Sequence, residues 1–172
     1  RPNTRLVSIN FPHNPTGKIL ERDRFDALVA LCRRHGIWLF SDEVYRPLGP
    51  TGTVHLPAAV DVYEKGLSLG VMSKAYGLPG LRIGWIACRD RELLQRMERY
   101  KHYLSICNSG PSEQLAIIAL KPREPIPART RGLLATILVH LARFFARSRV
   151  RSDSSPPHCC CVASPRSLAP LA

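Results

Sequence analysis

The residues best suited to chemistry lie between Ser73 and Trp85. Lys74 follows an apolar run, and Arg82 comes eight residues later, with glycines between the two. A lysine amine can join an aldehyde covalently, and an arginine guanidinium suits a doubly charged phosphate. Glycines allow the backbone to fold tightly around a ligand. This spacing favours a small molecule that carries both an aldehyde and a phosphate.

Two further polar clusters precede this segment. Residues Asn14–Gly17 read Asn-Pro-Thr-Gly, and residues Asp42–Tyr45 read Asp-Glu-Val-Tyr. Taken alone, the first cluster is typical of a turn and the second of a solvated strand end. A single lysine or arginine is nearly always a solvated charge. The functional interpretation therefore depends on the order and spacing of all three clusters together.

The elements that must position these clusters are strands alternating with helices. Apolar residues recur at helical spacing from Phe25 to Cys32, and Gly36 suits a left-handed cap, so we expect a helix over about 22–35. The continuous apolar run Ile37–Phe40 predicts a strand buried on both faces. Further strands are expected over 5–10, 65–71 and 83–88.

This alternation predicts an α/β fold with a largely parallel sheet, in which ligands bind beyond the carboxyl ends of the strands. Asn14 follows the first expected strand, Asp42 follows the second and Lys74 follows the third. We therefore expect one crevice to gather all three side chains.

The second half of the chain predicts mainly helices. Asp90 can cap a helix that continues to Tyr100, and Pro111 can begin another that carries Leu115, Ile118 and Ala119. The proline-rich residues 121–127 predict a connection. An apolar helical stripe over 133–145 predicts a helix docked on an apolar surface, and disorder is expected beyond residue 147.

Most of the positive charge belongs to the end of the chain. Residues 1–120 hold 16 Lys/Arg against 11 Asp/Glu, a net charge of +5, and residues 121–172 hold 9 against 2, a net charge of +7. Nucleic-acid binding requires basic residues patterned on one face within a recognisable module, and the sequence contains no such module. No nucleic-acid partner is therefore expected.

The cysteines and the apolar segments favour a soluble cytoplasmic protein. Cys32, Cys88 and Cys107 are scattered as small buried hydrophobic residues would be, which fits a reducing compartment. The run His158–Cys161 is a poor zinc site because adjacent cysteines do not readily chelate one tetrahedral ion, so no metal is expected. No signal peptide opens the chain, and the apolar stretch 133–146 is too short to span a membrane.

Across residues 1 to about 120, the three clusters in this order resemble the middle of a class I/II, fold-type I pyridoxal-phosphate (PLP)-dependent aminotransferase. The matching segments are Asn14–Gly17, Asp42–Tyr45, and Ser73–Lys74 followed by Arg82–Trp85. The resemblance implies the cofactor PLP, amino-acid and 2-oxo-acid substrates, and a homodimer. It also implies a cis peptide bond between Asn14 and Pro15.

The resemblance also implies a role for each matching residue. Lys74 would form the internal aldimine and then move the proton at the substrate α-carbon. This task requires an amine that can be neutral near pH 7, which a nearby cation and partial desolvation would favour. Asp42 would keep the pyridine nitrogen protonated, and Tyr45 and Asn14 would both bind the phenolic oxygen of the cofactor. The cofactor phosphate would be held by Arg82 and Ser73.

The sequence also departs from the family. Val71 stands where many relatives have a serine or threonine, and neither the earlier part of the large domain nor a C-terminal arginine for the substrate carboxylate has a counterpart. We expect residues 1–120 to be a partial PLP-binding large domain and 121–147 a helix connecting to a small domain. Residues 148–172 would be a low-complexity basic tail, and the abrupt change in composition there is what a shifted reading frame would produce.

These departures predict an incomplete chain that is inactive alone. A PLP-dependent lyase, decarboxylase or cyclase would keep Lys74, Asp42 and Arg82, because these residues specify the cofactor rather than the reaction. A PLP-sensing domain of a transcription regulator is a further alternative.

Overall fold

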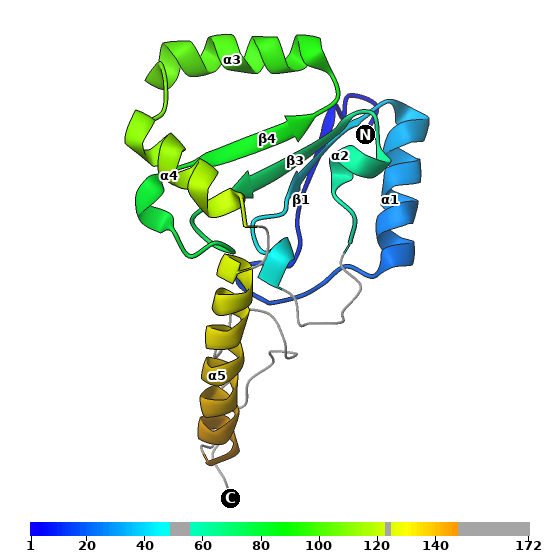
Figure 1. Ribbon diagram of the computed structural model, residues 1–172. Coiled ribbons are helices and arrows are strands. Elements are labelled where there is room, and N and C mark those ends of the chain that lie inside the picture. The colour runs from blue at the N-terminus through cyan, green and yellow to red at the C-terminus, as the bar shows by residue number, and fades with distance from the viewer. Residues whose placement is uncertain (49–55, 123–124, 148–172) are drawn as a thin grey trace, which may run out of the picture.

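The computed structural model describes residues 1–48, 56–122 and 125–147. Its strands are β1 (Leu6–Asn10), β2 (Trp38–Asp42), β3 (Gly66–Val71) and β4 (Gly84–Cys88). Its helices are α1 (Arg22–His35), α2 (Ala59–Val62), α3 (Arg91–Ser105), α4 (Gly110–Leu120) and α5 (Pro125–Arg147), with 3₁₀ turns η1 (Arg46–Leu48) and η2 (Pro79–Leu81). Figure 1 shows α1 beside the β1 side of the sheet and α3 beyond β4.

The four strands form one sheet in the order β1-β2-β3-β4. The pairs β1–β2 and β2–β3 are parallel, and β3–β4 is antiparallel. The predicted α/β fold with a mostly parallel sheet is therefore confirmed. Since β1, β2 and β3 run in the same direction, their carboxyl ends meet at one edge of the sheet.

The largest core lies between α1, α2 and the sheet. Its buried residues are Phe25, Val29, Cys32, Leu39, Ala59 and Tyr63. The helix α1 has the predicted bounds, because its apolar stripe packs on the sheet and Gly36 ends it with φ 62°. Burial of this stripe fixes the β2 strand that carries Asp42 at its end.

The prediction that the strand after α1 is buried on both faces is wrong. In β2, Leu39 and Ser41 are buried, whereas Trp38, Phe40 and Asp42 are only half-buried. The buried residues alternate with the half-buried ones because the core formed with α1 and α2 covers one face of the strand.

The helices α3 and α4 begin close to the predicted positions but bury little. The Asp90 carboxylate caps α3 by accepting from the Leu93 N–H at 2.9 Å, as predicted, yet none of the residues of α3 is buried. In α4 the small residues Ala116 and Ala119 are buried against Met72, whereas Leu115 and Ile118 are exposed. Of the three apolar residues that the sequence indicated for α4, Ala119 packs, whereas Leu115 and Ile118 do not.

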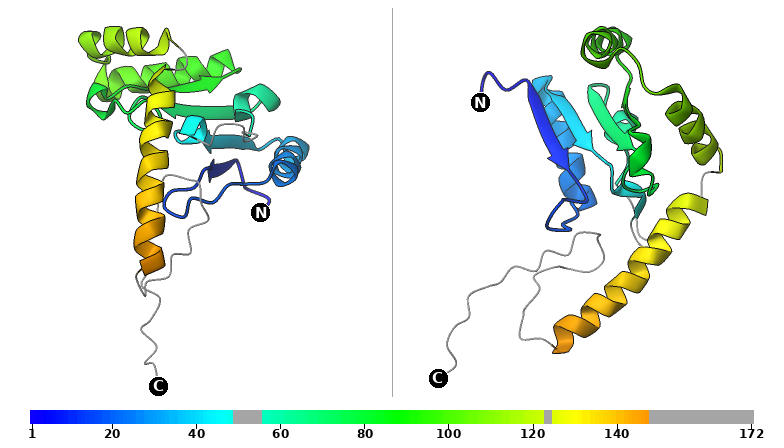
Figure 2. Two further views of the ribbon diagram at one scale, coloured as in Figure 1. Left: turned by 60° about the horizontal axis from the view of Figure 1, so that its bottom comes forward. Right: turned by 90° about the vertical axis from the view of Figure 1, so that its left-hand side faces the viewer.

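The long helix α5 begins within the proline-rich segment that the sequence predicts as a connection. Its first residue is Pro125, and proline is tolerated in the first turn because the N–H groups there have no helical partner. Ile126 packs near Met72, and Leu134 packs against the cluster that includes Tyr45. The rest of α5 projects away from the sheet (Figure 2).

Two sequence-based expectations lie outside the described residues: disorder beyond residue 147 and the interpretation of His158–Cys161. Within the described ranges, no helix has the length and apolar character needed to cross a membrane. The same ranges contain no group of three or more metal-binding side chains.

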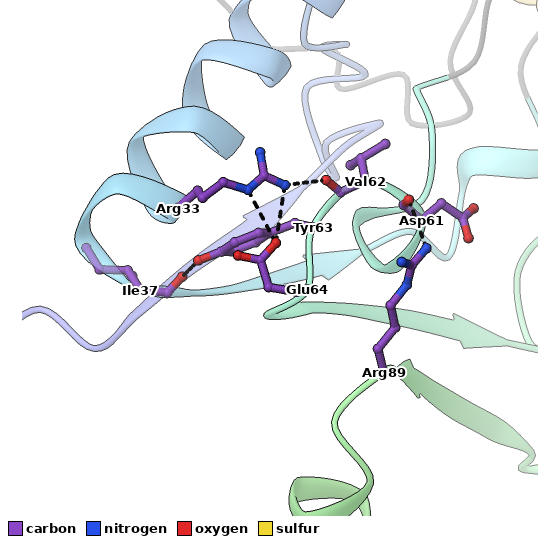
Figure 3. A network of polar contacts seen from close by, with 7 residues as sticks. All are labelled: Arg33, Ile37, Asp61, Val62, Tyr63, Glu64 and Arg89. Carbon is purple, nitrogen blue, oxygen red and sulfur yellow. Dashed lines mark hydrogen bonds and ion pairs between the residues drawn. The ribbon is translucent and has the colours of Figure 1, made fainter.

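Arg33, in the last turn of α1, ties this helix to the segment that follows α2 (Figure 3). Its guanidinium donates to Val62 O at 2.8 Å and to Glu64 Oε2 at 3.3 Å, and it lies 5.2 Å from the centre of the Tyr63 ring. A hydrogen bond from the backbone N–H of Glu64 itself, and then the Arg33 guanidinium, lower the pKa of the Glu64 carboxyl. This contact fixes the start of β3 beside the end of α1.

Tyr63 is the buried centre of this network, and its hydroxyl donates to Ile37 O at 2.8 Å. Burial, followed by the charge of Glu64, raises the pKa of Tyr63, and burial raises the pKa of Cys32. Because the pKa values of Cys32 and Tyr63 are higher in the folded chain than in the unfolded one, folding favours the neutral forms of both groups. Their contribution to the free energy of unfolding is complete below about pH 9 and is lost as the pH rises further.

We expect Tyr63→Phe to lower the free energy of unfolding at pH 7 by about 1–2 kcal/mol, because Ile37 O loses this donor. Above about pH 10 the variant should lose stability less steeply than the wild-type chain, since one of the two groups is gone. Thermal unfolding followed by circular dichroism between pH 7 and 11 measures both effects. Tyr103→Phe, at an exposed position, is the control. Equal slopes in Tyr63→Phe and wild type would contradict this account.

Candidate cofactor site

The loop after β1 presents Asn14 at the carboxyl edge of the sheet. The Asn14–Pro15 bond is cis, as predicted, and a second cis bond, Phe11–Pro12, was not foreseen. Asn10, the last residue of β1, accepts a hydrogen bond from the Asn14 N–H at 2.9 Å and donates to Asp42 O at 3.4 Å. Asn10 therefore connects the loop to the end of β2.

The end of β2 places Asp42 and Tyr45. Asp42 is half-buried, and its Oδ1 accepts from the Val44 N–H at 3.2 Å, which leaves Oδ2 without a hydrogen-bond donor in the described residues. Tyr45 is buried in a cluster with Val44, Leu48 and Ala75. This packing holds the Tyr45 ring between the end of β2 and the residue that follows Lys74.

Three of the predicted residues come together at this edge. The Asn14 side-chain amide donates to the Tyr45 hydroxyl at 3.3 Å, and Lys74 Nζ lies 5.7 Å from the centre of the Tyr45 ring. In the described residues, Lys74 has no ion pair and the Tyr45 O–H has no acceptor. The group thus has one amine and one hydroxyl proton available to a ligand.

The loop between β3 and β4 carries the remaining residues. Arg82 adopts the left-handed conformation, φ 54° and ψ 35°, which is uncommon outside glycine and occurs often at ligand sites. Its guanidinium donates to Pro79 O at 3.0 Å. Ser73 is half-buried and makes no side-chain hydrogen bond in the described residues. Within the described residues, no side-chain hydrogen bond or ion pair joins Ser73 or Arg82 to Asn14, Tyr45 or Lys74.

Lys74 is exposed in the described structure, so burial by these residues does not supply the partial desolvation that would favour a neutral amine. The segment around it runs Ser73–Arg82, and most of that loop is half-buried or exposed, with Ala75 the one buried residue. The ring of Tyr45 lies beside the amine, which makes no hydrogen bond or ion pair with the described residues.

Sequence reasoning missed two residues that shape this edge, Asn10 and Glu43. Asn10 ends a strand of five residues, and its polar side chain at that position was the available signal. Glu43 was interpreted as part of a solvated strand end, yet it is buried. No pattern in the sequence distinguishes a buried Glu43 from a solvated one, because its hydrogen-bond donors lie 16 and 25 positions away in the chain.

A pocket of about 240 Å³ lies beside this edge, between α2, the β3–β4 pair and η1. Glu43, Ser68 and Trp85 are among the residues that line it. None of the six predicted site residues lines this pocket, so it is distinct from the group around Lys74.

The described residues form an α/β layer with an amine, a carboxylate and a phenol at the carboxyl edge of a mostly parallel sheet. A solved structure described as a PLP-dependent aminotransferase has the same fold. That structure, from Streptococcus suis, superposes with a TM-score of 0.79 at 32% identity and covers 87% of this chain and 39% of that chain. Residues 1–138 match the family described as Aminotransferase class I and II, and the chain belongs to this family.

Curated relatives are similar over the same region. Mouse kynurenine–oxoglutarate transaminase 1 is 30% identical over 125 residues, which make up 72% of this chain and 29% of that protein. Capreomycidine synthase from Streptomyces vinaceus is 35% identical over 125 residues, or 69% of this chain and 30% of that protein. The chain therefore spans about three tenths of the length of these relatives.

Proposed function

We propose that this chain is the cofactor-binding part of a PLP-dependent aminotransferase, which transfers an amino group from an amino acid to a 2-oxo acid. The observation that carries the proposal is the convergence of Asn14, Tyr45 and Lys74 at one edge of the sheet, with Asp42 at the adjoining strand end. We further propose that the protein works as a homodimer in the cytoplasm, in a biosynthetic process, as family membership favours.

The donor groups of this edge fit PLP chemically. Lys74 offers an amine for the aldehyde, and Asp42 offers a carboxylate oxygen for a protonated ring nitrogen. The unused hydroxyl proton of Tyr45 suits an anionic phenolic oxygen, since a buried donor without an acceptor costs about 1–3 kcal/mol. Arg82 and Ser73 are the proposed ligands of the phosphate.

In this proposal each side chain has a defined task. Lys74 Nζ binds the aldehyde covalently and, once released, moves a proton at the substrate α-carbon. Asp42 holds a proton on the ring nitrogen, because an opposite charge at close range raises the proton affinity of that atom. Asn14 orients the Tyr45 hydroxyl by donating to its oxygen. When bound, PLP supplies the ring that withdraws electrons from the substrate α-carbon.

A PLP-dependent lyase, decarboxylase or cyclase is the second candidate. The relative named capreomycidine synthase favours it, because that protein is not named as a transaminase. The groups that choose between these reactions contact the substrate, and the proposed tasks of Lys74 and Asp42 are the same in either case.

Titration of the 172-residue chain with PLP tests the proposal. We expect a new near-visible absorbance band with PLP and none with pyridoxine 5′-phosphate, which has a phosphate but no aldehyde. Binding should be weak and amino transfer to a 2-oxo acid should be undetectable, because the chain spans a minor part of its relatives. A PLP spectrum that the added chain leaves unchanged would refute covalent binding of the aldehyde, and ready amino transfer would refute the expected inactivity.

A further inference from the structure

Glu43 is the only acidic or basic side chain that is buried in the described parts of the chain, with 8% of it exposed. Its Oε1 accepts a hydrogen bond from the Ala59 N–H at 2.8 Å and another from the Ser68 hydroxyl at 2.9 Å. Its Oε2 lies 3.3 Å from Arg46 Nε. One carboxylate therefore joins the end of β2 to α2, β3 and η1.

A buried carboxylate is costly unless it is paired and hydrogen-bonded. Glu43 meets this requirement with two donors on one oxygen and a guanidinium beside the other. Replacement of the side chain would leave Ala59 N–H and Ser68 without this acceptor. These contacts hold Glu43 in one position, and the backbone on either side of it is held with it.

Glu43 stands at the point where the chain leaves the sheet. Asp42 is the last residue of β2 paired with β3, opposite Leu69, and the Glu43 N–H donates to Leu69 O at 3.1 Å. Tyr45 follows two residues later, and the Glu43 carbonyl accepts from the Arg46 N–H at 2.9 Å. The chain thus leaves the sheet at Glu43, so the orientation of this residue decides where Tyr45 lies.

We propose that Glu43 is a positioning residue of the site: by joining the end of β2 to Ser68 of β3, it fixes the Tyr45 ring relative to Lys74, which follows β3. It contacts neither ligand nor reacting atoms itself. The inference rests on the proposed function, because Tyr45 and Lys74 are the residues that would bind the cofactor.

The position of Tyr45 can be followed without any cofactor. The five tyrosines are labelled as 3-fluorotyrosine, and the Tyr45 signal in the fluorine NMR spectrum is identified from Tyr45→Phe. We expect Glu43→Ala to shift or broaden this signal, and Ser68→Ala to change it in the same direction by less. Glu43→Gln should restore the wild-type signal, because its amide oxygen can still accept from Ala59 and Ser68.

The dissociation constant for PLP, measured on the same chains, is the second readout. We expect Glu43→Ala to raise it about tenfold and Glu43→Gln about threefold at most, as the loss of hydrogen bonds to a charged group predicts. The matched control is Glu64→Ala, which removes an exposed carboxylate paired with Arg33. It should leave both the Tyr45 signal and the dissociation constant unchanged.

Several outcomes would overturn the proposal. One is an unchanged Tyr45 signal in a folded Glu43→Ala chain, and another is an equal shift in Glu64→Ala. If Glu43→Ala does not fold, the Tyr45 signals of Ser68→Ala and Glu43→Gln test the proposal instead. An unchanged Tyr45 signal in Ser68→Ala then counts against the proposal. If the wild-type chain binds no PLP, the proposed function fails, whereas the fluorine signal still decides whether Glu43 positions Tyr45.

Discussion

Replacing Lys74 with alanine should abolish the PLP-dependent absorbance band and all covalent retention of the cofactor. The amine of Lys74 is exposed and has no ion pair in the described residues, so it is accessible to an aldehyde. Lys74 Nζ lies 5.7 Å from the centre of the Tyr45 ring, so this amine stands beside the Asn14–Tyr45 pair. We expect this to be the largest functional effect of any single substitution.

Reduction with borohydride followed by mass spectrometry checks the Lys74 prediction, because reduction makes the bond between lysine and cofactor permanent. The wild-type chain should gain the mass of one reduced cofactor on the peptide that contains Lys74. Lys65→Ala is a matched control: Lys65 also lies over an aromatic ring, 5.9 Å from that of Trp38, but precedes β3. Equal labelling of Lys74→Ala and Lys65→Ala would rule out Lys74 as the cofactor lysine.

The largest effect on stability is expected for Gly66→Ala. Gly66 begins β3 and is buried, and a methyl group added there would overlap the backbone carbonyl of Ala59 and lie 2.9 Å from Tyr63 O. Backbone atoms cannot turn aside as a flexible side chain can, so α2 would have to move away from the sheet. We expect a loss of at least about 3 kcal/mol in the free energy of unfolding.

Urea unfolding followed by circular dichroism measures this loss, and Gly80→Ala is its control. A methyl group added at Gly80 meets no atom within 4 Å, so this variant should be as stable as wild type or slightly more stable. A Gly66→Ala midpoint equal to that of Gly80→Ala would show that α2 yields without cost. That result would remove the close approach of α2 and β3 as a structural constraint.

The sequence predicted the parts of this fold that depend on local patterns. The apolar period from Phe25 to Cys32 and the cap at Gly36 define α1, because both act within a few residues. The sequence predicted that Asn14, Asp42 and Lys74 share one crevice, because parallel strands end at one edge. In the structure Asn14 and Lys74 each lie beside Tyr45, which is three residues after Asp42.

Features that depend on distant partners were not predictable in this way. Glu43 has the same sequence signal as a solvated acidic residue, and its burial depends on hydrogen bonds from the distant Ala59 and Ser68 as well as on the nearby Arg46. Of the apolar residues expected on α4, Ala119 is buried with Ala116 against Met72, whereas the larger Leu115 is exposed. In both cases the outcome is decided by residues that the local pattern does not contain.

The order of the strands also sets the entropic cost of forming each pairing. The pair β1–β2 joins residues 32 positions apart (38 − 6), β2–β3 joins residues 27 apart (66 − 39), and β3–β4 joins residues as close as 13 apart (84 − 71). Closing the 13-residue loop costs about 0.8 kcal/mol less chain entropy than closing the 32-residue one. Lys74 and Arg82 lie inside that shortest loop, so the segment proposed to hold the cofactor belongs to the part of the sheet that is cheapest to order.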